Sequence, residues 1–149
     1  MLEWLKTNAL AARNKLADEV SKFRNQEFME AVVSGCALVA AADGNVSAEE
    51  KRKMAGYIQN SAELKVFDMS KVISAFNAAV EKFEFDAEIG HAEALRTIAK
   101  ISKKPDAGRL LVRVCCAIGN ADGSFDEKER AVCRTICREL GLSPADFDL

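Results

Sequence analysis

The sequence has little of what marks membrane or nucleic-acid-binding proteins. No apolar run approaches the roughly 18–20 residues that span a bilayer, so we expect no membrane span. The net charge of −2 argues against general nucleic-acid binding, which requires a strongly basic face. The chain also has just two prolines and one histidine among its 149 residues. These absences favour a soluble protein that is rich in helix.

Disulfide and export signals are absent as well. The five cysteines are an odd number, and no CxxC motif is present. The first residues, Met1–Lys6, lack the basic n-region and the uninterrupted apolar segment of a signal peptide. We therefore expect a cytoplasmic protein with reduced thiols.

Helical spacing of apolar residues recurs through the chain, and no convincing alternation with a period of two is found. The composition, 49% hydrophobic and 30% charged, fits one globular domain with a sizeable core. We predict an all-α, single-domain bundle over residues 1–149, with about seven helices. The predicted helices cover about 2–23, 26–41, 47–60, 70–83, 86–102, 106–119 and 126–139.

One element occurs twice. The segment 42–51, ADGNVSAEEK, returns 79 residues later as 121–130, ADGSFDEKER. The duplication predicts two copies of one helix-loop-helix unit, at about 26–60 and 106–140, packed as a pseudo-symmetric core. In the first copy, Gly44 suits the left-handed C′ position of a helix, and Ser47 with Glu50 forms a capping box.

The duplicated loops present carboxylates at matching places. They match the second half of an EF-hand loop, but neither copy has an acidic residue at loop positions 1 and 3. A complete calcium loop is therefore excluded in either copy alone. The remaining carboxylates would pool into one site for calcium or another hard divalent cation, with the ligands Asp43, Glu50, Asp122, Asp126 and Glu129.

Helix capping is the alternative explanation of these residues. A tight connection between two helices uses a glycine, an N-cap residue and an acid three residues later. Capping therefore explains Ser47, Glu50, Asp126 and Glu129 without a metal. It leaves Asp43 and Asp122 unexplained, because both precede the glycine. Both interpretations stay open on the sequence.

Cysteines and the single histidine offer weaker candidates. Four thiols lie on two neighbouring predicted helices: Cys115, Cys116, Cys133 and Cys137. They would bind a soft metal or reduce an oxyanion. However, Cys133 and Cys137 align with apolar positions of the first copy, which indicates packing in the core. His91 has no marked catalytic partner and is predicted to be solvated or capping.

At the paired Ala-Asp-Gly-x-apolar-(Ser/Asp)-x-x-Glu-(Lys/Arg) elements, the chain resembles the tellurite-resistance TerB family. The resemblance extends over nearly the whole length. It implies a compact helical fold, a cytoplasmic location and a role in resistance to tellurite and related stress. It also implies a multi-component system with a membrane-embedded partner, and hence peripheral association with the inner membrane. The acidic residues suggested as metal ligands in this family map onto Asp43, Glu50, Asp122 and Glu129.

We accordingly expect a non-enzymatic component of a tellurite-resistance and stress-response system. It would bind a divalent cation, partner proteins of that system, or both, through the acidic loops. Two alternatives remain: thiol-dependent binding or reduction of tellurite by the cysteines, and a helical adaptor without a metal.

Overall fold

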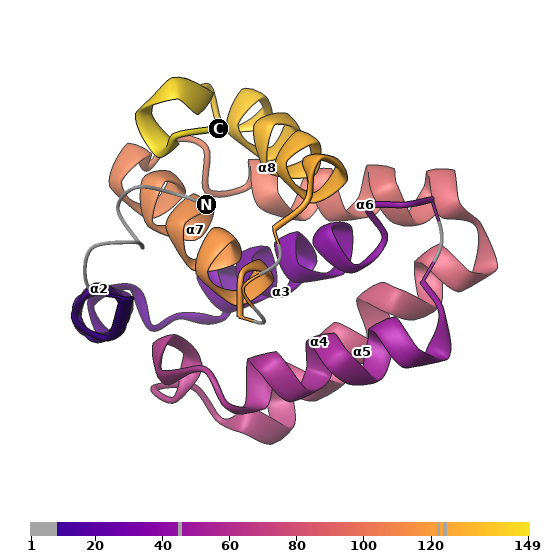
Figure 1. Cartoon of the computed structure of the whole chain (residues 1–149), viewed down its shortest axis with the longest axis horizontal. Helices are drawn as coiled ribbons and strands as arrows, with labels where there is room; N and C mark the ends of the chain where they lie inside the picture. Colours follow the sequence, from indigo (N-terminus) through magenta and orange to yellow (C-terminus); the bar gives the residue numbers. More distant parts are fainter. Residues whose placement is uncertain (1–8, 45, 122, 124) are drawn as a thin grey trace.

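The computed structural model describes residues 9–149 except 45, 122 and 124. This part of the chain forms seven α-helices and no strand, which confirms the all-α prediction (Figure 1). The helices are α2 (Ala9–Val20), α3 (Gln26–Ala40), α4 (Ala48–Gln59), α5 (Met69–Phe85), α6 (Ala87–Ala99), α7 (Pro105–Gly119) and α8 (Glu127–Glu139). Three short 3-10 turns supplement them: η1 (Ser21–Phe23), η2 (Ala62–Leu64) and η3 (Pro144–Phe147). None of the helices in the described ranges is long and apolar enough to cross a membrane.

Helices α3 and α7 form the centre of the core. Residues 31–40 of α3 are all buried, as the nearly continuous apolar sequence predicted. In α7, the buried stretch 110–119 is interrupted once, by Arg113. The two helices contact each other, and α3 also packs against α5 and α6. The loops that follow α3 and α7 therefore extend directly from the centre of the core.

Side chains that precede the helices fix where they begin. Ser47 accepts a hydrogen bond from the Glu50 N–H at 3.1 Å, and Asp126 accepts one from the Glu129 N–H at 2.8 Å. Asp86 likewise caps α6. Pro105 is the first residue of α7, where its missing N–H costs no helical hydrogen bond.

The described part of the N-terminal helix packs on the bundle, as its apolar stripe predicted. Leu16 and Val20 of α2 are buried in the common core. Arg13 donates from Nε to Glu63 Oε1 at 2.6 Å and from Nη2 to Glu63 Oε2 at 3.1 Å. This bidentate pair joins α2 to η2. Trp4 and the rest of the predicted helix lie outside the described residues.

The two helix-loop-helix units correspond locally at the offset of 79 residues. Helices α3 and α7 both contain 15 residues, and α3 contacts α8 as α7 contacts α4. The C-cap residues Ala41 and Asn120 have nearly equal dihedral angles, φ −94° and ψ 14° against φ −93° and ψ 14°. Superposition of the two whole pairs stays a prediction.

The structure corrects the expected role of the loop glycines. Gly44 and Gly123 have positive φ, 108° and 80°, but neither occupies the C′ position. The C-cap residue is Ala41 or Asn120, and each glycine follows three residues later. Its N–H donates to the carbonyl of that C-cap residue at 3.0 Å in both loops. The glycine therefore closes a turn after the helix, and the residue before it, Asp43 in the first loop, lies inside that turn.

Candidate functional site

Four of the five predicted ligands line one pocket of about 250 Å³. Asp43 and Glu50 come from the first loop and the start of α4, while Asp126 and Glu129 come from the start of α8. The fifth predicted residue, Asp122, lies outside the described residues. The tertiary structure therefore brings carboxylates of the two sequence copies to a common pocket.

The second loop holds its two acids in a capping box. Asp126 Oδ1 accepts from the Glu129 N–H at 2.8 Å, and Glu129 Oε1 accepts from the Asp126 N–H at 3.1 Å. Asp126 is exposed and Glu129 is half-buried. Because an ionised carboxylate has about four acceptor positions, these capping bonds leave acceptor capacity on both side chains.

The first loop is capped differently from the prediction. Ser47 Oγ accepts from the Glu50 N–H, as expected, and its hydroxyl also donates to Glu50 Oε1 at 3.2 Å. The Glu50 carboxylate is thus held by the serine hydroxyl, whereas the Glu129 carboxylate is held by a backbone N–H. Asp43 is exposed within the turn before Gly44 and caps neither helix. Capping therefore leaves Asp43 unexplained in the structure as well as in the sequence.

Opposite charges also line the pocket. Lys53 and Lys128 contribute ammonium groups, and Tyr57 adds a phenol. The carboxyl ends of α3 and α7 reach the pocket at Ala40 and Gly119, where the helix carbonyls carry partial negative charge. Within the described residues, no three metal-ligating side chains are already clustered closely enough to hold a metal. Direct ligation by several of these acids would require their side chains to move closer together.

Sequence reasoning missed the lysines and the tyrosine. Glu50, Lys53 and Tyr57 follow one another at helical steps of three and four residues, so they share one face of α4. That spacing would have placed Lys53 and Tyr57 beside the predicted ligand. Lys128 has no such signal, because its position depends on how α8 packs.

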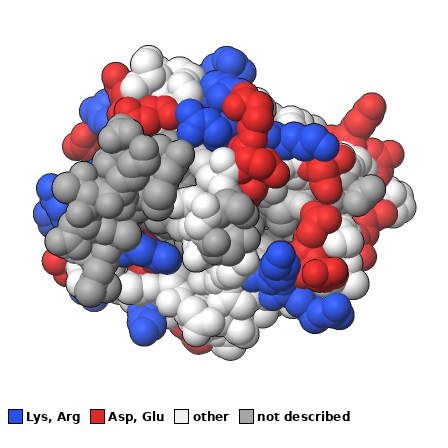
Figure 2. Space-filling model, viewed as in Figure 1, with Lys and Arg blue, Asp and Glu red and all other residues white. Residues whose placement is uncertain are grey.

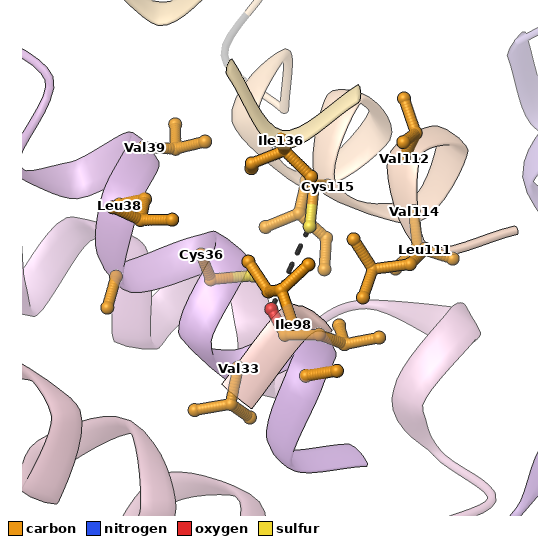
Figure 3. Packing of buried hydrophobic residues seen from close by; sticks show 14 of the residues in the cluster. Val33, Cys36, Leu38, Val39, Ile98, Leu111, Val112, Val114, Cys115 and Ile136 are labelled. Carbon is orange, nitrogen blue, oxygen red and sulfur yellow. Dashed lines mark hydrogen bonds between the residues drawn. The ribbon is translucent and has the colours of Figure 1, made fainter. Parts of the chain in front are cut away.

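The cysteines are core residues. All five are buried and free of disulfides, in agreement with the packing interpretation. Cys36 and Cys115 lie among aliphatic side chains, and the Cys115 thiol points toward the Val32 carbonyl at 3.8 Å (Figure 3). The hydrogen bond with Cys36 and burial raise the pKa of Cys115 well above its usual range.

Two further thiols are similar to Cys115. The hydrogen bond with Cys133 and burial raise the pKa of Cys116, and burial raises the pKa of Cys137 to about 12. Protonated, buried thiols are poor nucleophiles, so this environment disfavours thiol chemistry on tellurite. His91 is exposed on α6, in agreement with a solvated histidine.

The fold and the pocket together define a class of protein: an all-α protein whose two acidic inter-helix loops meet at one pocket. Residues 29–149 match the family described as "Tellurite resistance protein TerB". A protein from Alcaligenes sp named "Tellurium resistance protein TerB" is 42% identical over 104 residues, which cover 70% of this chain and 85% of that protein. The chain belongs to the TerB tellurite-resistance family. No solved structure matches the chain.

Proposed function

We propose that the protein is a non-enzymatic component of a tellurite-resistance and stress-response system, and that it binds a hard divalent cation at the acidic pocket. The observation that carries the proposal is the meeting of Asp43, Glu50, Asp126 and Glu129 at one pocket. The donor set consists of carboxylate oxygens, which suit calcium or another hard cation better than a soft metal. Family membership supports the role in tellurite resistance.

The cation would act through charge. Carboxylates that face one pocket repel one another, and the nearby helix carboxyl ends add to that repulsion. A divalent cation would neutralise them and hold the two loops together, with Asp122 of the second loop as a further ligand. The ordered loops would then serve a partner protein of the same system, including a membrane-embedded one, at the cytoplasmic side of the inner membrane.

Thermal unfolding with and without divalent ions tests the cation site. A cation that binds the folded chain alone stabilises it by about 2.7 kcal/mol at a hundredfold excess over the dissociation constant. For a chain of this size this corresponds to a rise in Tm of about 5–10 °C. We expect that rise with calcium or another hard divalent ion in protein purified without chelator.

The decisive variant removes charge without removing a cap. Asn caps helices about as well as Asp, so Asp43→Asn combined with Asp126→Asn keeps α8 capped and should abolish the ion-dependent rise. The control, Glu49→Gln with Glu127→Gln, removes two charges from the same helix starts but from residues that do not line the pocket. It should retain the rise.

Pure capping predicts other results. The ions would leave the Tm unchanged, and Ser47→Ala or Asp126→Ala would each cost about 0.5–2 kcal/mol. No response to calcium, magnesium, manganese or zinc would refute the cation proposal and leave a metal-free helical adaptor. Replacement of all five cysteines tests the alternative of thiol chemistry on tellurite. Cells that contain this variant at the normal protein level and remain resistant to tellurite would exclude the thiol hypothesis.

A further inference from the structure

The corner between α5 and α6 carries two exposed apolar side chains. Phe85, the last residue of α5, is 83% exposed, and Ile89 in the first turn of α6 is 46% exposed. Among the described residues, these are the large hydrophobic side chains that are exposed. The corner projects at one end of the molecule, away from the central helices α3 and α7 (Figure 1).

The local fold does not require Phe85. Phe83 is buried and lies against Gly90, where a Cβ would come within 2.6 Å of the Phe83 backbone nitrogen. Asp86 caps α6 by accepting from the N–H groups of Glu88 and Ile89. An apolar residue before an N-cap often packs on the fourth helical residue, but here that residue is Gly90, which offers no side chain. Phe85 therefore neither fills the core nor staples the helix.

The surroundings of Phe85 are acidic. Residues 81–93 contain five acidic side chains and one lysine, and this lysine, Lys82, pairs with Glu93 at 3.8 Å. Glu84 pairs with Lys51 of α4 at 3.7 Å and remains half exposed. The other acids of the corner are exposed: Glu81, Asp86 and Glu88. Figure 2 shows acidic side chains gathered at the end of the molecule where α5 turns into α6.

We propose that this corner is a docking surface for a protein partner that has an apolar cavity bordered by lysine or arginine. Phe85 would enter the cavity, Ile89 would lie beside it, and the acids would face the basic border. A large aromatic side chain in a desolvated pocket dominates the binding energy of many interfaces, and complementary charge around it sets specificity and association rate. The same acids repel anionic lipid and nucleic acid, which leaves a basic protein as the complementary occupant.

Site-specific photocrosslinking tests the proposal in the full-length chain. A photoreactive phenylalanine analogue replaces Phe85 in cells that express the tellurite-resistance system. A matched protein carries the analogue at Lys103, which is exposed on the connection between α6 and α7. We expect a specific crosslinked protein from position 85 but not from position 103, with lysine or arginine close to the crosslinked segment.

Binding measurements with that purified partner then give the contribution of each exposed side chain to the affinity. Phe85→Ser should raise the Kd by at least about tenfold, as expected for an interface anchor. Glu81→Lys combined with Glu88→Lys should raise the Kd and weaken its dependence on salt concentration. Both variants should retain the wild-type circular dichroism spectrum, because the substituted side chains are exposed.

Three outcomes would overturn the proposal. One is equal crosslinking from positions 85 and 103, and another is a crosslink from position 85 to a second copy of this chain. The third is Phe85-dependent binding to vesicles of phosphatidylglycerol and phosphatidylethanolamine without a protein partner. The surface is independent of the cation pocket. Phe85→Ser should therefore leave the ion-dependent rise in Tm unchanged, so failure of one proposal is distinguishable from failure of the other.

Discussion

Replacement of Arg13 by Gln should destabilise the protein far more than an ordinary surface charge change. Glu63 is fully buried, and its carboxylate accepts two hydrogen bonds from the Arg13 guanidinium, at 2.6 and 3.1 Å. The variant leaves that carboxylate buried without its cationic partner. Removal of one partner from a buried ion pair costs about 3–5 kcal/mol. Because the Arg13 side chain is 28% exposed, we expect a loss near the lower limit, about 3 kcal/mol.

The chain offers a matched control for this measurement. Arg96 donates to Glu93 at 2.7 Å, a similar distance, but its side chain is 70% exposed. Arg96→Gln should cost about 0.2–1 kcal/mol, because water screens the pair and solvates the groups left behind. Urea unfolding followed by circular dichroism at pH 7 gives both free energies of unfolding.

A double variant separates loss of attraction from the cost of an unpaired charge. Arg13→Met with Glu63→Leu removes both charges and retains side-chain volume, so it should recover most of the stability that Arg13→Gln loses. The reasoning is refuted if Arg13→Gln costs no more than Arg96→Gln. It is equally refuted if the double variant is less stable than Arg13→Gln.

Two further predictions concern packing and pH. Gly90→Ala should cost about 1–3 kcal/mol of stability, because its Cβ would lie 2.6 Å from the Phe83 nitrogen. Gly56→Ala meets nothing within 4 Å and should stabilise α4 by about 0.5–1 kcal/mol. Thermal melts that rank the two variants in the opposite order would contradict this prediction. The Cys137 thiol has an ordinary pKa of 9.0 and a folded pKa of about 12, so its contribution to stability is complete below about pH 9 and is lost as the pH rises toward 12. Urea unfolding between pH 9 and about 10.5 should show a slope that Cys137→Ala makes shallower by about 1 kcal/mol per pH unit, and an unchanged slope would show that the thiol does not titrate in this way.

Local sequence signals predicted the helices because each signal acts within a few residues. Ser47 and Asp126 mark the starts of α4 and α8, and the apolar run of α3 indicates a buried helix. The position of the glycine relative to the end of the preceding helix was predicted less well. Gly44 has the expected positive φ, but the helix ends at Ala40 and a further turn intervenes, which the residue types alone do not reveal.

The candidate site was predictable in composition but not in geometry. Duplication of the Asp-Gly element singled out the acids, and four of them do line one pocket. Lys128 of the same pocket was not predicted, because it reaches the pocket through the packing of α8. The buried pair of Arg13 and Glu63 was also missed, since 50 residues separate its members and neither lies in a recognisable motif.

The sequence by itself determined which segments of the described chain are helical, where α4 and α8 begin and to which family the chain is similar, since periodicity, N-capping and motif spacing are properties of neighbouring residues. Only the tertiary structure decided that the carboxylates of the two copies share a pocket with two lysines. It also decided that Phe85 is left outside the core. These outcomes depend on how α3, α7 and α8 pack and on the close approach of α5 and α6 at Gly90. Such packing arises from many long-range contacts that no single segment encodes.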